Sequence, residues 1–247
     1  DLDLTTCTVP GYVVHDAASV AGINVSGHAV LGWDMAGLDL TGCVLDNVAD
    51  LSQEQIRSAA CVQKCSFAGV CMRGWDLSGM DLTGVSLKDS DLTGVDLTGA
   101  TLTGACLTGT ILEGAYLTDA VIDGVTGLSG DQLAKVSSID GVVFTRFESK
   151  GVCLGGLDVS KCDFTGATLT GDTLLGATGL TCAQVVSMEC ITSLNLSSQD
   201  LTDWDLSGRT LTGCNLTNAI IERTLFKDCD LSDVTIGDVT GLTIDQL

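Results

Sequence analysis

Residues 77–122 read LSGMDLTGVSLKDSDLTGVDLTGATLTGACLTGTILEGAYLTDAVI, and this stretch decides the fold. Ten apolar residues lie five positions apart in it without a slip, namely Leu77, Leu82, Leu87, Leu92, Leu97, Leu102, Leu107, Leu112, Leu117 and Ile122. An α-helix repeats about every 3.6 residues and a regular strand about every 2, so neither accounts for this spacing. A period of five predicts a short extended step followed by a turn, repeated along the chain.

We name these ten residues the centre positions and expect them to form the core. The residue two places before each centre is mostly apolar or small, as at Val85, Val95 and Ala100. Residues two apart on an extended backbone point to the same side, so both positions should face inward. The residue between them should face outward, and it is polar in the first part of the run: Asp76, Asp81, Ser86, Asp91, Asp96 and Thr101.

The turn is predicted by the residue two places after each centre. Gly occupies this position in most units and Asp occupies it at Asp89 and Asp119. Gly adopts positive φ freely, and Asp does so more readily than most residues. Coils that turn in this way stack as ladders about 4.8 Å apart, and each buries its apolar side only against its neighbours. The sequence therefore predicts a solenoid.

The unit in residues 91–100, DLTGVDLTGA, resembles the repeat of the pentapeptide-repeat family. The resemblance implies an all-β solenoid, a right-handed quadrilateral β-helix of stacked pentapeptide coils with short helical interruptions. The period alone indicates stacked turns and leaves handedness and the number of sides open. The same frame recurs at 20–45, 154–174 and 196–236, so we expect one continuous solenoid over residues 1–247.

A second motif marks the joints between runs of repeats. It reads DLSQEQI at 50–56, GLSGDQL at 127–133, GLTCAQV at 179–185 and GLTIDQL at 241–247. Ser or Thr before polar residues and an apolar pair predicts a short N-capped helix, and Ser52 with Gln55 has capping-box spacing. We place helical joints near 51–60, 128–137, 180–190 and 242–247. Because the fourth motif ends at Leu247, we expect the native chain to continue.

Composition narrows the classes of partner. The formal net charge is −21 and the isoelectric point is near 4.1. This balance argues against binding nucleic acid or an anionic membrane directly through a basic face, and it allows mimicry of nucleic acid. No run of 18 apolar residues exists, so no transmembrane span is predicted. The chain starts at Asp1, which suggests a processed N-terminus.

The twelve cysteines have three interpretations. Several lie on the small inward position, where a free thiol acts as a small hydrophobe: Cys43, Cys162, Cys214 and Cys229. Others lie near the joints and are candidates for one or two disulfides in an oxidising compartment: Cys61, Cys65, Cys71, Cys182 and Cys190. A zinc site is the weaker reading, because no second cysteine pair matches them and the histidines are only His15 and His28.

We find no constellation that predicts catalysis, so we expect no enzyme and no cofactor. No Ser/His/Asp or Cys/His arrangement stands out, and the glycines are turn glycines. Asp76 and Asp96 lie 20 residues apart and would stack with four units per coil. Such a carboxylate ladder could bind Ca²⁺ or could simply form a solvated acidic face.

The outward position becomes apolar late in the run. Ile111, Tyr116 and Val121 occupy it, and Ile220 does so near the C-terminus. Apolar side chains on an outward position suggest a partner surface, although the helix starting near Leu128 could equally cover them.

These features favour a non-catalytic interaction protein, a rigid acidic solenoid that docks on protein partners in a larger assembly. The resemblance implies a specific form: an accessory subunit in the thylakoid lumen of a chloroplast, peripherally attached to a photosynthetic membrane complex. Extracellular or periplasmic placement comes next. The alternative function is a DNA mimic that inhibits or protects a type II topoisomerase. A third class, ligand or ice binding by threonine ladders, would use Thr93, Thr98, Thr103 and Thr108.

Overall fold

The computed structural model describes residues 20–145, 147 and 152–246. The expected processed N-terminus, His15 and the last residue of the fourth joint lie outside the described residues. The described chain divides into two compact units, one within Asp1–Leu128 and Lys135–Val142 and the other within Ser129–Ala134 and Val143–Leu247. One continuous solenoid over residues 1–247 stays a prediction.

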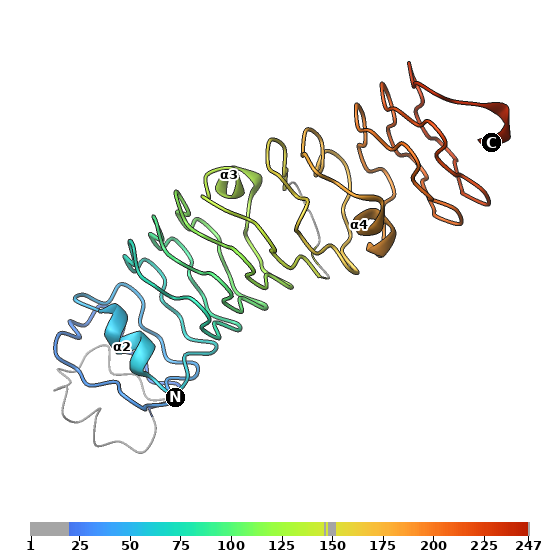
Figure 1. The fold of residues 1–247 in the computed structure, drawn as a ribbon. Helices are drawn as coiled ribbons and strands as arrows, with labels where there is room; N and C mark the ends of the chain where they lie inside the picture. Colours follow the sequence, from blue (N-terminus) through green and yellow to red (C-terminus); the bar gives the residue numbers. More distant parts are fainter. Residues whose placement is uncertain (1–19, 146, 148–151, 247) are drawn as a thin grey trace. The chain divides into compact units, whose positions relative to one another are not determined.

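Each unit is built from stacked coils that return after 20 residues (Figure 1). Parallel bridges join Asp76 to Asp96 and Asp96 to Tyr116 in the first unit, and Asp205 to Leu225 in the second. Since the sequence unit has five residues, a return of 20 residues contains four units per coil. In the described residues the expected β-structure consists of isolated bridges, because each extended step is interrupted by a turn after a few residues.

Two kinds of backbone hydrogen bond hold the coils. Between coils, the Leu77 N–H donates to the Asp96 carbonyl at 2.8 Å, and the Asp96 N–H donates to the Trp75 carbonyl at 2.8 Å. Within a turn, the Val95 N–H donates to the Leu92 carbonyl at 3.1 Å. The backbone groups of the extended steps therefore find hydrogen-bond partners on neighbouring coils, and those of the turns find partners within the turn.

The turn position adopts the predicted left-handed conformation. Gly94 has φ 66°, and Asp89 and Asp119 both have φ 56°. Lys64 and Arg223 also have positive φ, at 58° and 56°, a conformation that is unfavourable for such side chains. The repetition of the coil thus imposes the turn geometry even where Gly and Asp are missing.

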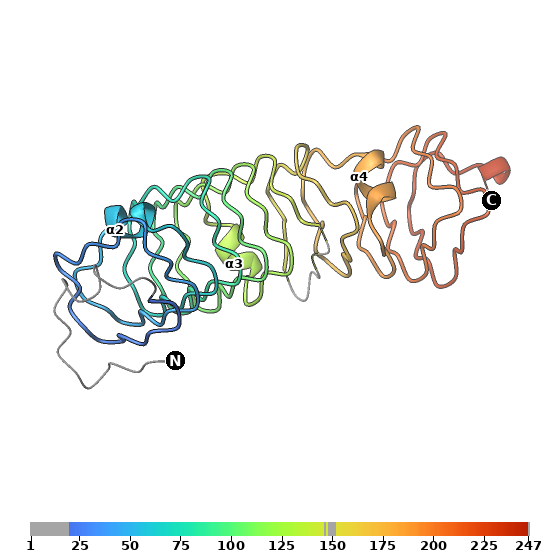
Figure 2. The ribbon, with the colours of Figure 1, turned by 90° about the horizontal axis from the view of Figure 1, so that it is seen from below.

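Short helices occupy the joints. They are α2 (Gln53–Ser58), α3 (Gly130–Leu133), α4 (Cys182–Ser187) and the 3₁₀ helix η1 (Ile244–Gln246). Capping boxes begin α2, α3 and α4, with Ser52, Ser129 and Thr181 as N-caps. Figures 1 and 2 both show α2 beside the first coils, where the Arg57 guanidinium donates to the Asp76 carboxylate at 3.2 Å. Bridges across a joint span 22 residues, as from Asp39 to Cys61, so each helix adds two residues to its coil.

The capping-box glutamines of α2 and α4 also bind the coil that comes before their helix. Gln55 Nε2 donates to the Val30 and Trp33 carbonyls at 2.8 and 2.9 Å. Gln184 Nε2 donates to the Val159 and Cys162 carbonyls at 2.7 and 2.8 Å. In both cases the two acceptors are the ends of a single turn, so the glutamine fastens the joint helix to that turn.

Candidate functional site

The centre positions fix which side chains can reach a partner. All ten of the sequence-predicted core residues are buried, and none exposes more than 2% of its surface: Leu77, Leu82, Leu87, Leu92, Leu97, Leu102, Leu107, Leu112, Leu117 and Ile122. The residue before each centre consequently points away from the core.

The structure separates the four predicted partner-surface residues. Ile111 and Tyr116 are 47% and 48% exposed, Ile220 is 39% exposed, and Val121 is half-buried. A turn follows each extended step, so Ile111, Tyr116 and Val121 lie on successive segments of one coil and point to different sides. Ile220 belongs to the second unit. The four residues therefore do not form one flat patch.

An aspartate lies next to most of these exposed side chains, on the preceding coil. Parallel bridges pair Ile111 with Asp91, Tyr116 with Asp96, and Ile220 with Asp200. Val121 is the exception and pairs with Thr101. Side chains paired in this way stand side by side on one face, about 4.8 Å apart at the backbone.

Leu225 is a functional candidate that the sequence interpretation missed. It is 51% exposed and pairs with Asp205. The signal was present, because Leu225 directly precedes the centre Phe226 and so occupies an outward position. Reading the outward position through the whole last run would have found it.

The aspartates differ in their partners. The Arg73 Nε lies 2.5 Å from the Asp91 carboxylate, and Arg57 pairs with Asp76. Within the described ranges, no ion pair joins Asp96, Asp200 or Asp205 to a basic side chain. The Asp96 oxygen accepts the Thr98 N–H at 2.9 Å. These three carboxylates keep their charge available on the surface.

Local hydrogen bonds favour the ionised form of Asp200 and Asp205. The Ser207 hydroxyl, and after it the Ser207 N–H, donates to Asp205 and lowers the pKa of that carboxyl. The Thr202 hydroxyl and N–H lower the pKa of Asp200 in the same way. The Asp76 and Asp96 ladder brings two carboxylates together, one of them bound by Arg57. Over the described residues, no group of three or more His, Cys, Asp or Glu side chains is arranged to hold a metal ion.

The predicted disulfides do not occur among the described cysteines. Cys61, Cys65, Cys71, Cys182 and Cys190 are all free thiols. Cys65 occupies an inward position, whereas Cys61 and Cys71 occupy outward positions on different segments, so their thiols point in different directions. Cys190 lies 3.1 Å from the Thr192 hydroxyl, and the Cys182 thiol faces the Asp205 carbonyl at 3.6 Å.

Inward thiols donate hydrogen bonds in addition to filling space. The Cys43 and Cys65 thiols donate to the Val20 and Leu40 carbonyls at 2.9 and 2.8 Å. Ser90 does the same at an equivalent position, donating to the Phe67 carbonyl at 2.7 Å. Burial raises the pKa of Cys65 to about 12 and raises the pKa of Cys43 as well, so both stay protonated and unreactive.

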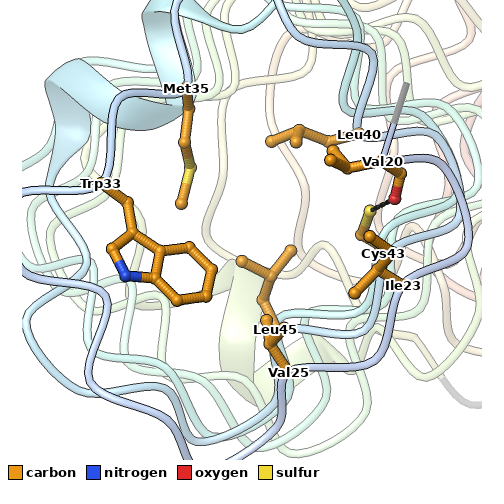
Figure 3. Close-up of a pocket in the computed structure, with 8 residues that line it drawn as sticks. All are labelled: Val20, Ile23, Val25, Trp33, Met35, Leu40, Cys43 and Leu45. Carbon is orange, nitrogen blue, oxygen red and sulfur yellow. Dashed lines mark hydrogen bonds between the residues drawn. The ribbon is translucent and has the colours of Figure 1, made fainter. Parts of the chain in front are cut away.

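A small apolar cavity lies inside the first described coils of the first unit (Figure 3). Its volume is about 20 Å³, and its walls come from Val20, Ile23, Val25, Trp33, Met35, Leu40, Cys43 and Leu45. The polar contact drawn there joins the Cys43 thiol to the Val20 carbonyl. A cavity of this size holds about one water and offers no ligand chemistry.

Parts of the chain match a known repeat family. Residues 63–99, 96–126 and 195–236 match the family model described as pentapeptide repeats, in eight copies. These segments of the chain are pentapeptide repeats. No curated protein matches the sequence. Among the residues that the structure describes, no helix is both long and apolar enough to cross a bilayer.

Solved pentapeptide-repeat structures resemble this pentapeptide-repeat chain at low identity. HetL of the cyanobacterium Nostoc sp. strain PCC 7120, involved in heterocyst differentiation regulation, is 23% identical over 93% of this chain and 90% of its own, with TM-score 0.33. A thylakoid lumen protein of Arabidopsis thaliana is 23% identical over 59% and 71%, with TM-score 0.25. The full-length plasmid-mediated fluoroquinolone resistance protein QnrB1 is 14% identical over 92% and 95%, with TM-score 0.26. Likenesses at this level transfer no function.

Proposed function

We propose that this chain is a non-catalytic interaction protein that docks on a larger protein assembly. One observation carries the proposal: Ile111, Tyr116 and Ile220 expose large apolar side chains at outward positions of their coils. Burying such a side chain against a partner stabilises a complex by about 1.5–3 kcal/mol when the burial is complete. The family supports this function, because pentapeptide-repeat proteins generally act through protein interactions and not through catalysis.

We further propose that the stacked coils form a right-handed quadrilateral β-helix. The 20-residue return of the bridges supports four sides, since each side then corresponds to one five-residue unit. Flat sides of this kind would present the outward residues as straight ladders to a partner.

The specific form of the proposal is an accessory subunit in the thylakoid lumen of a chloroplast, attached peripherally to a photosynthetic membrane complex. Extracellular or periplasmic placement is second. A net charge of −21 disfavours direct contact with anionic lipid, so attachment would go through protein subunits.

Native-gel migration of the endogenous protein from fractionated cells tests the proposal, with mass spectrometry of the co-migrating proteins. We expect co-migration with a large membrane complex, and loss of co-migration when Ile111→Asp and Tyr116→Asp are combined. A protein that migrates alone at about its own chain mass in every fraction would contradict the docking function. Thr103→Asp is the control, because it adds charge at a position without an exposed apolar neighbour.

A DNA-mimicking inhibitor or protector of a type II topoisomerase is the alternative, and the charge of −21 is the observation that favours it. A mimic of duplex DNA presents carboxylates in place of phosphates, so it should compete with DNA for the enzyme. A supercoiling assay with purified topoisomerase tests this. An enzyme whose activity and drug sensitivity stay unchanged at saturating concentrations of the chain would remove the alternative.

A further inference from the structure

Two stretches of the sequence repeat the same outward pattern, one in each unit. Residues 111–117 read ILEGAYL and residues 220–226 read IIERTLF. The coil before each has a matching pattern, with DLTGVDL at 91–97 and DLTDWDL at 200–206. In each pair, the first Asp and the first Ile lie 20 residues apart, which is the length of one coil.

The structure stacks each pair into one site. In the first unit, Ile111 lies beside Asp91 and Tyr116 lies beside Asp96; in the second, Ile220 lies beside Asp200 and Leu225 beside Asp205. Backbone bonds fix the Tyr116 pairing from both sides, since the Tyr116 N–H donates to the Val95 carbonyl and its carbonyl accepts the Leu97 N–H, each at 2.9 Å. The equivalent bonds of Leu225, to Trp204 and Leu206, measure 2.8 and 3.0 Å.

Both sites wrap around one turn and carry an acidic residue there. Glu113 and Glu222 occupy the turns, and both are exposed. The turn brings the two apolar side chains onto adjacent segments of the coil, with a carboxylate beside each. We name the first group site 1 and the second group site 2: site 1 is Asp91, Asp96, Ile111, Glu113 and Tyr116, and site 2 is Asp200, Asp205, Ile220, Glu222 and Leu225.

We propose that sites 1 and 2 are equivalent docking sites for a protein segment that carries apolar side chains flanked by Arg or Lys. The inference rests on the proposed docking function and names the chemistry of the partner. The exposed apolar side chains, 39% to 51% accessible, contact the partner's apolar side chains. The neighbouring carboxylates pair with its cations, and the ring of Tyr116 adds an attractive face for an arginine.

Charge selects this occupant over a second copy of the chain. Two chains of net charge −21 repel each other, and sites 1 and 2 both carry three acidic residues. The basic residues near the sites neutralise them only in part: Arg73 pairs with Asp91 of site 1, and Arg223 lies 3.7 Å from Glu222 of site 2 and 2.5 Å from Asp203. Asp96, Asp200 and Asp205 keep the charge that a basic partner would meet.

Isothermal titration of the full chain with a short peptide of alternating leucine and arginine tests the proposal at low salt. We expect one peptide bound per site, hence two per chain. Ile111→Ser with Tyr116→Ser removes one of the two, and Ile220→Ser with Leu225→Ser removes the other. Asp96→Asn or Asp205→Asn weakens binding at its own site about threefold to tenfold, while the matched Asp158→Asn leaves affinity unchanged. Circular dichroism and thermal melting check that each variant folds.

Two results overturn the inference. A glycine–arginine peptide that binds as tightly as the leucine–arginine peptide would mean that only net charge attracts it. Stoichiometry that stays the same in the serine variants would place the binding elsewhere. The native-gel experiment separates this failure from that of the proposed function: if the fourfold serine variant still co-migrates with its assembly, the docking function holds and sites 1 and 2 are not the contact.

Discussion

At the scale of the residue, the five-residue unit gives each position one environment. The centre and the residue two before it face the core, the residue between them faces solvent, and the second residue after the centre turns the chain. Leu97 is fully buried, whereas its neighbour Thr98 is half-buried on the turn. Adjacent residues should therefore differ strongly in their tolerance of substitution.

Leu97→Asp should destabilise the protein by about 3–5 kcal/mol, because it buries a carboxylate in a stacked apolar ladder. Thr98→Ala should change the stability by no more than about 0.5 kcal/mol. Thermal or urea denaturation measures both. The reverse ranking would show that the inward and outward frame is misassigned.

Ser90→Cys tests the structural function of the inward thiols. Cys43 and Cys65 already donate to a carbonyl from the position that Ser90 occupies, so the thiol should keep stability within about 0.5 kcal/mol of the native protein. Ser90→Ala loses the bond to the Phe67 carbonyl and should cost about 1 kcal/mol. Denaturation midpoints compare the two variants. Equal destabilisation by both would mean that volume, not hydrogen bonding, decides this position.

Thiol reactivity gives an independent check at this scale. Burial raises the pKa of Cys65 to about 12, whereas Cys71 is exposed on an outward position. Folded protein treated with an alkylating reagent near neutral pH should label Cys71 rapidly and Cys65 only after unfolding. Mass spectrometry of the labelled peptides reads both rates. Rapid labelling of Cys65 in the folded state would contradict its burial.

At the scale of the element, the stability of a joint helix depends more on one glutamine than on the length of the helix. Gln184 is buried, accepts the Thr181 N–H at 2.8 Å and donates to two carbonyls of the preceding coil. The same side chain thus caps its helix and attaches it. A helix of six residues has little stability of its own, so this attachment should matter more than helix propensity.

Gln184→Leu should destabilise the second unit by about 2–4 kcal/mol, because it removes the hydrogen bonds of a buried side chain to the Val159 and Cys162 carbonyls and to the Thr181 N–H. Ala183→Leu on the exposed face of the same helix is the control and should be nearly neutral. Hydrogen exchange of the amides in α4, with denaturation of the whole protein, measures the effect. A nearly neutral Gln184→Leu would mean that water or other groups replace these bonds.

The sequence predicts the elements better than the contacts between coils. The period of five assigned Leu97 to the core and Gly94 to the turn, and the Ser52 and Gln55 spacing marked the capping box. Predicting the two hydrogen bonds from Gln55 to the Val30 and Trp33 carbonyls requires knowing which turn lies beside the helix. Likewise, pairing Tyr116 with Asp96 requires the number of units per coil, which a period of five does not contain.

At the scale of the whole molecule, two electrostatic effects oppose each other. A net charge of −21 repels itself and weakens the compact state. Locally, carboxylates are held in the turns: five aspartates have a lowered pKa because a Ser or Thr hydroxyl, and then its backbone N–H, donates to them, namely Asp39, Asp76, Asp200, Asp205 and Asp230. The local bonds act over hydrogen-bond distances, whereas the repulsion acts over longer ones.

Salt separates the two effects. At 0.15 M salt the screening length is about 8 Å, so the repulsion is weakened and the turn bonds are not. Because these carboxyls have a lower pKa in the folded state, the unfolded chain binds more protons at acidic pH, and stability falls as the pH decreases below about 4. At low salt the fall should be smaller, since protonation then also relieves the repulsion.

Asp39→Asn isolates the contribution of one carboxylate charge to the hydrogen bonds in its turn. Asn can keep the turn, because Asn215 already accepts the Thr217 N–H at 2.9 Å in an equivalent place, but it cannot ionise. The native protein should melt above the variant at pH 7, and the difference should vanish as the pH falls through the lowered pKa of Asp39, because both side chains are then neutral acceptors. Thermal melting across this range at fixed salt measures the difference. A gap that stays constant with pH would mean that the charge of Asp39 contributes nothing to its turn, and the acid sensitivity of the fold would then have to arise from the remaining carboxylates.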